Sequence, residues 1–264
     1  MDADGPALVT GASRGLGRAV ALELARHGFD VYAAMRDPAN AAGLEEEAAG
    51  LKGGIRVVEL DVTRPEGMTL PSGLRVLVNN AGIERDYLPV ESAPMTQWRD
   101  VFETNVFGLV EVTRRAIPLM RAGRGGVICN ITTSSLLVSV PFYAVYRASK
   151  AAVAALGESL RAEVAPFGIR VVEVLPGPID TDMLASSSRR PEAADVDGYE
   201  TLAQAWAEGR AGIAGFITPP ADAAAAICDA ILLDHGPLRI RCDELGGQLL
   251  GAWQSDPEGT LGAR

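Results

Sequence analysis

The chain alternates between short, uniformly apolar segments and longer segments in which apolar residues recur at helical spacing. The short segments do not switch between apolar and polar positions, as expected of strands buried on both faces. Strands alternating with helices predict an α/β Rossmann-type fold, in which helices cover both faces of a doubly wound, mostly parallel sheet. The segments predicted to be strands are Pro6–Thr10, Asp30–Met35, Ile55–Leu60, Leu74–Val78, Val127–Ile131 and Ile169–Leu175.

Helical spacing begins directly after the first predicted strand. Leu16, Val20 and Leu24 recur at intervals that place them on one helix face, and Gly28 is expected to end this helix. Longer helical patterns cover Met95–Met120 and Ala148–Val164.

Residues 184–216 interrupt this pattern with a run of serines, paired arginines and several acidic residues. We expect them to form a substrate lid, inserted into one dinucleotide-binding domain that spans residues 1–264. Their aromatic residues and the preceding Met183 either shape the substrate pocket or simply pack; the aromatic residues concerned are Tyr199, Trp206 and Phe216. The last dozen residues are rich in glycine and polar residues, so a loosely held tail or an interface arm is expected there.

Composition narrows the class of protein. A net charge of −10 argues against nucleic acid or an anionic membrane as the main partner. Cys129, Cys228 and Cys242 lack the spacing of a disulfide framework or a zinc site, and the chain has 2 histidines, so no metal centre is expected. No signal peptide and no apolar run of membrane-spanning length is visible, which predicts a cytoplasmic protein.

A glycine-rich loop joins the first predicted strand to the first predicted helix. Its glycines permit a tight turn, a close approach of backbone N–H groups to a pyrophosphate and close packing of the helix on the sheet. The N-terminus of the helix also favours an anion, so this context predicts a dinucleotide site. The loop residues expected to contact the cofactor are Gly11, Ser13, Arg14, Gly15, Leu16 and Gly17.

The same loop also matches the G-x-S-x-G nucleophile elbow of α/β-hydrolases, because Gly11 and Gly15 flank Ser13. A hydrolase would then use His235 as its base. We favour the dinucleotide site, because an elbow at the first strand is misplaced and the sequence contains no HGGG-type oxyanion loop.

The end of the second predicted strand bears on the choice of cofactor. Proteins that bind NAD usually have an acidic residue there, which accepts a hydrogen bond from the ribose 2′-hydroxyl group. In this chain Met35 is followed by Arg36, which can pair with a 2′-phosphate. Arg14 in the glycine loop can add a second positive charge, so the sequence predicts NADP(H).

Tyr146 and Lys150 stand one helical turn apart, so on a helix their side chains share one face. A free tyrosine has a pKa near 10. A neighbouring ammonium group lowers that pKa and eases proton exchange with a substrate oxygen. Alone, this spacing would indicate a pair on the surface of a helix, and the other motifs favour the catalytic interpretation.

Taken together, the motifs resemble those of the short-chain dehydrogenase/reductase family and follow that family's order. They are TGASRGLG at 10–17, NNAG at 79–82, Asn105 in an ETN stretch, YRASK at 146–150 and PGPIDTDM at 176–183. Segments 31–38 and 140–153 are locally similar to the branch that includes hydroxysteroid and retinol dehydrogenases, which hints at a hydrophobic substrate.

The resemblance implies a role for each matching residue. Tyr146 would exchange a proton with the substrate oxygen, and Lys150 would bind the nicotinamide ribose and lower the pKa of Tyr146. Asn105 would hold a water molecule in the proton relay. Other residues implied in cofactor binding are Asp61 and Val62 at the adenine, Asn79, Ala81 and Gly82 along the cleft, and Pro176, Gly177, Ile179 and Thr181 beside the nicotinamide. The family commonly forms dimers or tetramers through the helices that hold Asn105 and Tyr146.

One position departs from the family pattern. The family usually has a serine thirteen residues before the tyrosine, where its hydroxyl group orients the substrate oxygen. In this chain that position holds Thr133, whose extra methyl group crowds the site and restricts χ1. If the alignment with the family pattern were shifted by one residue, Ser134 would take this role. We favour Thr133, because the alignment then continues to Pro141 without a gap.

The expected function is therefore that of an NADPH-dependent ketoreductase or alcohol dehydrogenase, which moves a hydride between the nicotinamide and a carbonyl or secondary alcohol carbon. The departure at Thr133 leaves open an atypical tailoring enzyme that dehydrates, isomerises or cyclises its substrate. A third hypothesis is a non-catalytic NADPH-binding regulator. Tyr146 and Lys150 disfavour it, since a protein that only binds needs no activated phenol.

Overall fold

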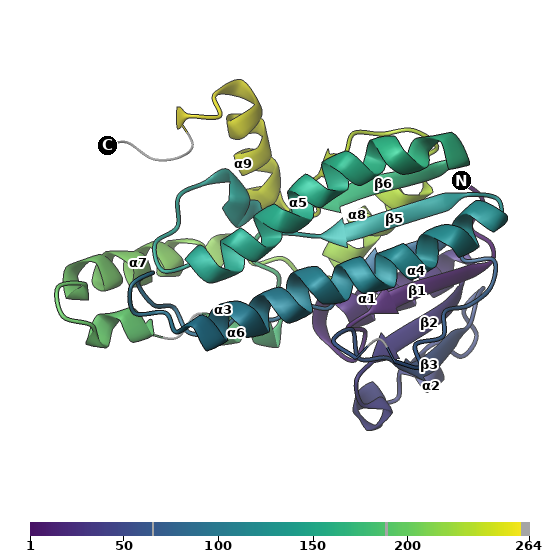
Figure 1. Ribbon diagram of the computed structural model, residues 1–264, viewed down its shortest axis with the longest axis horizontal. Helices are drawn as coiled ribbons and strands as arrows, with labels where there is room; N and C mark the ends of the chain where they lie inside the picture. Colours follow the sequence, from purple (N-terminus) through teal and green to yellow (C-terminus); the bar gives the residue numbers. More distant parts are fainter. Residues whose placement is uncertain (65, 188–189, 260–264) are drawn as a thin grey trace.

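The computed structural model describes residues 1–64, 66–187 and 190–259. Within them, seven parallel strands form one sheet in the order β3-β2-β1-β4-β5-β6-β7 (Figure 1). This confirms the predicted α/β Rossmann fold. The strands are β1 Pro6–Thr10, β2 Asp30–Met35, β3 Ile55–Glu59, β4 Val76–Asn79, β5 Gly126–Ile131, β6 Ile169–Val174 and β7 Arg239–Ile240.

Helices cover both faces of the sheet through two hydrophobic cores. On one face α1 (Gly15–His27) and α8 (Pro220–Leu232) pack on the strands and on each other. On the other face lie α4 (Leu109–Ala122) and α5 (Ala144–Val164), which run in front of the sheet in Figure 1. Because both faces are covered, the strands are apolar throughout rather than alternating.

The remaining helices differ from the sequence prediction in their bounds. The predicted helix Met95–Met120 consists of α3 (Met95–Phe102), a π-helical segment Glu103–Gly108, and α4. The sequence placed the start of α5 at Ala148, four residues late. The other helices are α2 Leu44–Glu47, α6 Asp182–Ser187, α7 Glu200–Gly212 and α9 Glu244–Ser255.

The segment predicted as a lid, residues 184–216, contains the end of α6, all of α7 and two short 3-10 helices. Residues 188 and 189 of that segment lie outside the described residues. The predicted loose tail begins within α9, whose Leu250 is buried against Leu137 and Leu175. Residues 260–264 of the tail are not described.

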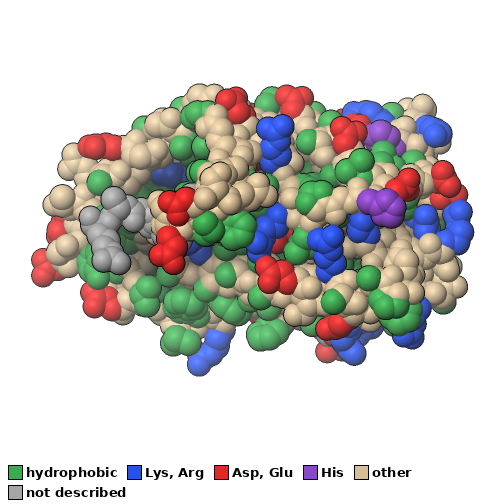
Figure 2. Space-filling view, turned by 90° about the horizontal axis from the view of Figure 1, so that it is seen from above, with side chains coloured by type: hydrophobic (Ala, Val, Ile, Leu, Met, Phe, Trp, Pro, Cys, Tyr) green, Lys and Arg blue, Asp and Glu red, His purple; other side chains and the backbone are tan. Residues whose placement is uncertain are grey.

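The surface carries charges of both signs. Lys and Arg side chains lie among Asp and Glu side chains on the face shown in Figure 2, with hydrophobic side chains between them. Among the described residues, we find no helix with the length and apolar character that a membrane crossing requires. The thiols of Cys129, Cys228 and Cys242 are buried and free.

The carboxyl ends of the strands meet at one edge of the sheet. β5 points toward the end of the molecule where α6 and α7 lie (Figure 1). Strand order reverses between the neighbours β1 and β4, and open α/β sheets bind ligands in the crevice at such a switch point. The fold thus places the ligand site at this edge.

Candidate active site

A cleft of about 800 Å³ opens at the carboxyl edge of the sheet. It extends from the glycine loop after β1, past the ends of β4, β5 and β6, to α6 and α7. The predicted site residues that line it are Gly11, Ser13, Arg14, Gly15, Leu16, Gly17, Arg36, Asp61, Val62, Ala81, Gly82, Thr133, Tyr146, Lys150, Pro176, Gly177, Ile179 and Thr181.

The glycine loop has the geometry of an anion cradle. Its backbone turns through left-handed conformations, with φ of 67° at Gly11 and 56° at Gly15, which favour glycine. α1 begins at Gly15, and the side chain at the N-cap position makes no capping hydrogen bond. The first N–H groups of α1 are therefore left for a ligand at the positive end of the helix dipole. This loop fits the pyrophosphate of a dinucleotide.

Asn80 was not among the predicted site residues, yet it holds the glycine loop in place. Its Nδ2 donates to the carbonyl oxygen of Thr10 at 3.0 Å and to that of Gly11 at 3.1 Å. Its backbone N–H donates to Thr10 Oγ1 at 3.0 Å. The end of β4 and the loop after β1 are thereby fixed to each other across the switch point.

Asn79 was expected to line the cleft, and the structure does not place it there. Its Nδ2 donates to Thr113 Oγ1 of α4 and to Asn130 Oδ1 of β5, each at 2.9 Å, and the side chain is buried. Successive strand residues point to opposite faces, so the neighbouring asparagines cannot both face the loop. Of the two asparagines in the motif NNAG, Asn79 therefore joins β4 to α4 and β5, and Asn80 holds the glycine loop.

The two arginines of the predicted phosphate site have different surroundings. Arg36 follows β2, is exposed, and lines the same cleft as Asp61 and Val62. Arg14 instead forms an ion pair with Asp182 of α6, with 3.2 Å between its Nη1 and Oδ2. Exposed pairs of this kind contribute little to stability, so Arg14 can exchange its partner for a phosphate at small cost.

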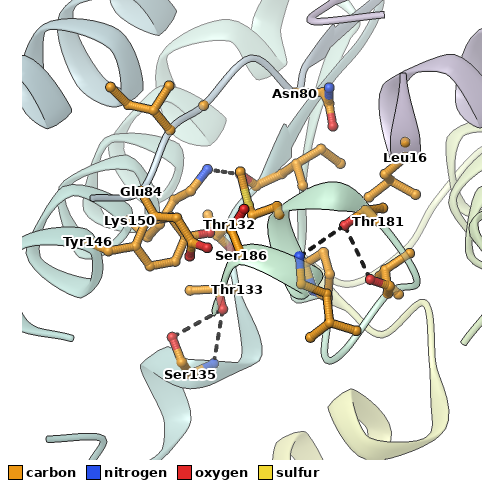
Figure 3. A pocket seen from close by; sticks show the side chains of 18 of the residues that line it. Leu16, Asn80, Glu84, Thr132, Thr133, Ser135, Tyr146, Lys150, Thr181 and Ser186 are labelled. Carbon is orange, nitrogen blue, oxygen red and sulfur yellow. Dashed lines mark hydrogen bonds between the residues drawn. The ribbon is translucent and has the colours of Figure 1, made fainter. Parts of the chain in front are cut away.

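α5 presents Tyr146 and Lys150 to the cleft on one helix face (Figure 3). The Lys150 Nζ atom lies 5.7 Å from the centroid of the Tyr146 ring. The same Nζ donates to the carbonyl oxygen of Ile131, at the end of β5, at 2.8 Å. Lys150 is buried, so this hydrogen bond fixes its ammonium group beside the phenol.

Asn105 does not line the cleft but lies behind it, in the π-helical segment between α3 and α4. Its Oδ1 accepts from the N–H of Ile83 at 2.8 Å, and its Nδ2 donates to the carbonyl oxygen of Ile83 at 2.9 Å and to Ser149 Oγ at 3.0 Å. A Cβ atom at Gly82 would lie 3.3 Å from Asn105 Oδ1 and 3.4 Å from Lys150 Nζ. Asn105 therefore ties the loop after β4 to α5 next to Lys150.

Burial is the largest influence on the pKa values of Tyr146 and Lys150. It lowers the pKa of Lys150 to about 8, while the charge of Glu84 acts in the opposite direction. It raises the pKa of Tyr146 well above the usual value, and the charges of Glu84 and Tyr143 raise it further. Burial thus acts on the Tyr146 pKa in the direction opposite to the lowering that is expected from the Lys150 ammonium group.

Thr133 follows β5 and caps a 3-10 helix, Ser134–Leu137. Its Oγ1 accepts from the N–H of Ser135 at 3.2 Å and donates to Ser135 Oγ at 3.1 Å (Figure 3). Ser134 also lines the cleft, with its N–H bonded to the carbonyl oxygen of Pro176 at 2.8 Å. Thr133 therefore stays the predicted substrate-orienting residue, with Ser134 as its alternative.

Aromatic side chains surround the far end of the cleft. Tyr87 stacks on Tyr143 with 4.9 Å between ring centroids, and Trp206 of α7 packs on Tyr87 at 5.3 Å. Met183 and Trp206 line the cleft, whereas Tyr199 packs within the aromatic cluster. This end, remote from the glycine loop, is the candidate substrate pocket.

Glu84 lines the same end of the cleft and was not predicted as a site residue. Burial raises the pKa of its carboxyl group to about 7. No local motif marks Glu84, because the residues that surround its carboxyl group come from the loop after β4, α5 and α7, which are far apart in the sequence.

Comparison with known proteins identifies the family. The family profile described as short chain dehydrogenase matches residues 6–192. The chain is 39% identical over 186 residues to the 3-oxoacyl-(acyl-carrier-protein) reductase FabG of Staphylococcus aureus, a match that covers 67% of this chain and 75% of that protein. The chain therefore belongs to the short-chain dehydrogenase family and is an oxidoreductase of a family that binds nicotinamide cofactors.

Solved structures agree with this assignment. A short-chain dehydrogenase of Burkholderia cenocepacia in complex with NADP is similar over 98% of this chain and 97% of that chain, with a TM-score of 0.72 and 28% identity. A short-chain dehydrogenase/reductase of Burkholderia phymatum in complex with NAD has a TM-score of 0.78 over 100% of this chain and 98% of its own, and at 23% identity it shows the fold alone. The hydrolase alternative is thereby excluded.

Proposed function

We propose that this protein is an NADPH-dependent reductase or dehydrogenase that interconverts a carbonyl compound and a secondary alcohol. The observation that carries the proposal is the presence of Tyr146 and Lys150, side by side, in the cleft that also contains the glycine loop. NADP(H), when bound, supplies or accepts the hydride. The residues that would hold it are those of the glycine loop, Arg36, Asp61, Val62, Pro176 and Gly177.

Tyr146 would donate its phenolic proton to the carbonyl oxygen in the reduction and take it back in the oxidation. Its raised pKa keeps the phenol protonated at neutral pH, which suits the reduction. Lys150, with a pKa of about 8, is mostly protonated at pH 7 and can stabilise negative charge that develops on the phenol oxygen. Asn105 would hold the loop after β4 against α5, the helix that carries Tyr146 and Lys150.

Incubation with NADPH and a panel of aliphatic and aromatic ketones tests the proposal. We expect NADPH absorbance to fall only when a ketone is present, with formation of the matching alcohol. Tight NADPH binding without turnover of any carbonyl would favour the regulator hypothesis. A product other than the alcohol would favour dehydration, isomerisation or cyclisation.

Replacing Arg36 with alanine is expected to raise the KM for NADPH by about 10-fold or more, because a charge-assisted hydrogen bond to the 2′-phosphate is lost. The KM for NADH should change by less than about 2-fold, since NADH lacks that phosphate. Steady-state kinetics with both cofactors measure the difference.

Arg99→Ala is the matched control for Arg36→Ala, because Arg99 is an exposed arginine of α3 and its loss changes the net charge equally. This variant should leave both KM values unchanged. Equal effects of Arg36→Ala on NADPH and NADH would contradict the proposed NADPH preference.

Thr133→Val removes a hydroxyl group at nearly constant volume and is expected to lower kcat by about 10- to 100-fold, the effect of losing one hydrogen bond to the reacting oxygen. Ser134→Ala should lower kcat by less than about 3-fold, since this hydroxyl is not assigned to the substrate. If only the serine variant loses turnover, the register is shifted by one residue and Ser134 is the orienting group.

We also propose that the described residues of segment 184–216 cover the bound substrate. We propose in addition that subunits pair through the helices that hold Asn105 and Tyr146. Contacts of Trp206 with the aromatic cluster support the first proposal. Phe107, 58% exposed in the π-helical segment, supports the second.

A further inference from the structure

Glu84 lies in the loop that follows β4, at the substrate end of the cleft. Its Oε1 atom is buried and has no hydrogen-bond partner among the described residues. Its side chain lies beside Tyr146 and Lys150 in Figure 3, and its charge acts on both of these groups. The carboxyl group is therefore close to the point where a substrate oxygen would meet Tyr146.

Two tyrosines flank this carboxyl group. Tyr87 and Tyr143 oppose the effect of burial on the pKa of Glu84. Their rings are stacked and nearly parallel, with an interplanar angle of 4°. Their hydroxyl oxygens lie 3.4 Å apart, so both hydroxyl groups point to the same side. Glu84 thus has polar hydroxyl groups as neighbours, while its Oε1 remains without a hydrogen-bond partner among the described residues.

α7 contributes further polar groups to this end of the cleft. Trp206 and Arg210 stand one turn apart and both line the cleft, with the guanidinium carbon 5.6 Å from the Trp206 ring centroid. The charge of Arg210 acts on Glu84. The Trp206 Nε1 atom is buried and, like Glu84 Oε1, has no hydrogen-bond partner in the described part of the chain. One buried donor and one buried acceptor thus occur at the same end of one cleft.

Unpaired buried polar atoms are expensive, and native proteins satisfy the great majority of them. At Glu84, burial raises the pKa of the carboxyl group to about 7. A wholly apolar substrate would leave the free-energy cost of these unpaired polar atoms unchanged or increase it. A substrate with its own hydrogen-bond donor would reduce this free-energy cost, because Glu84 lines the cleft and its carboxyl group can accept a hydrogen bond there.

We propose that Glu84 is a specificity-determining residue, whose carboxyl group accepts a hydrogen bond from a hydroxyl or amino group next to the carbonyl carbon of the substrate. This inference rests on the proposed function, since it takes the reacting oxygen to lie at Tyr146. The substrate class is then an α-hydroxy or α-amino ketone with an apolar remainder, which the apolar lining residues Val138, Ile213 and Leu249 contact.

Matched ketones test this inference. Hydroxymethyl, aminomethyl and methoxymethyl phenyl ketone share one skeleton, but the methyl ether cannot donate a hydrogen bond. The wild-type protein should prefer the hydroxymethyl or the aminomethyl ketone over the ether by about 10-fold or more in kcat/KM, since a site built to bind a donor rejects the analogue without it. Which of the two is preferred tells a hydroxyl substrate from an amino substrate.

Glu84→Met, which removes the acceptor at similar volume, should reduce this preference to less than about 3-fold, while Glu84→Gln should restore part of it through its amide oxygen. Glu163→Gln, at an exposed position of α5, is the control and should leave the preference unchanged. A purely structural role of Glu84 would lower turnover of all three ketones alike. An unchanged ratio in the methionine variant would overturn the inference.

Calorimetry separates this inference from the proposed function. The protein saturated with NADP⁺ should bind 1-phenylethane-1,2-diol or 2-amino-1-phenylethanol more tightly than 2-methoxy-1-phenylethanol. The Glu84→Met variant should lose this difference in affinity. This readout needs no turnover. Absence of ketone reduction together with a Glu84-dependent binding difference would contradict only the proposed reaction, whereas equal binding in wild type and variant would contradict the role of Glu84.

Discussion

The Tyr146→Phe variant is expected to have a kcat about 10³-fold below that of the wild-type protein, within the range of 10²- to 10⁴-fold typical of a lost general acid. The phenol is the acid that the cleft offers beside Lys150, and its raised pKa keeps the proton in place at neutral pH. The affinity for NADPH should change by less than about 3-fold, because the ring remains and only one hydroxyl is removed. Single-turnover kinetics with an active ketone and calorimetric titration with NADPH measure the two quantities.

Tyr143→Phe provides the matched control for Tyr146→Phe. Tyr143 lines the same cleft, and its ring lies edge-on to that of Tyr146 with 5.7 Å between centroids. Loss of its hydroxyl group should lower kcat by less than about 10-fold, since this hydroxyl is not assigned to proton transfer with the substrate. Equal losses in both variants would contradict the assignment of Tyr146 as the acid.

The Gly17→Ala variant is expected to lose at least about 100-fold in NADPH affinity, because overpacking costs typically 1–3 kcal/mol and here also moves the anion cradle. A Cβ atom at this position would lie 2.3 Å from Asn80 Nδ2 and 2.4 Å from the carbonyl oxygen of Gly11. Neither neighbour can yield easily, since Asn80 Nδ2 is bonded to two loop carbonyls and Gly11 belongs to the loop itself. Calorimetric titration with NADPH and thermal unfolding measure the binding and the stability.

Gly251→Ala is the control for Gly17→Ala. Gly251 lies within α9, and a Cβ atom there would meet no atom within 4 Å. Alanine in an open helical position should stabilise the protein by about 0.5–1 kcal/mol and leave NADPH binding unchanged. Retention of wild-type affinity by Gly17→Ala would show that the loop does not hold the pyrophosphate.

The strands illustrate which parts of the fold a sequence predicts. β1 and β2 have the predicted bounds, because glycine and polar residues interrupt the apolar pattern where these strands end. β7 was missed, since Arg239–Ile240 is too short and too little buried to leave an apolar segment. The π-helical segment at Glu103–Gly108 was also missed, because a single widened turn alters the apolar spacing over too few residues to stand out in the pattern.

The sequence by itself determined the geometry of the glycine loop and the position of Tyr146 and Lys150 on one helix face. Gly11, Gly15, Tyr146 and Lys150 act through local geometry, namely a turn with positive φ and one helical turn, and local geometry follows from residue type and spacing. The same holds for the alternation of strands and helices, which hydrophobic burial on both faces of the sheet dictates.

Only the tertiary structure decided which of the two neighbouring asparagines braces the glycine loop and which is buried under α4. It also decided the pairing of Arg14 with Asp182 and brought Glu84 to the same end of the cleft as Trp206. These contacts join segments far apart in the chain. Their partners are set by how the strands stack at the switch point and where α7 packs, and no spacing along the sequence encodes either.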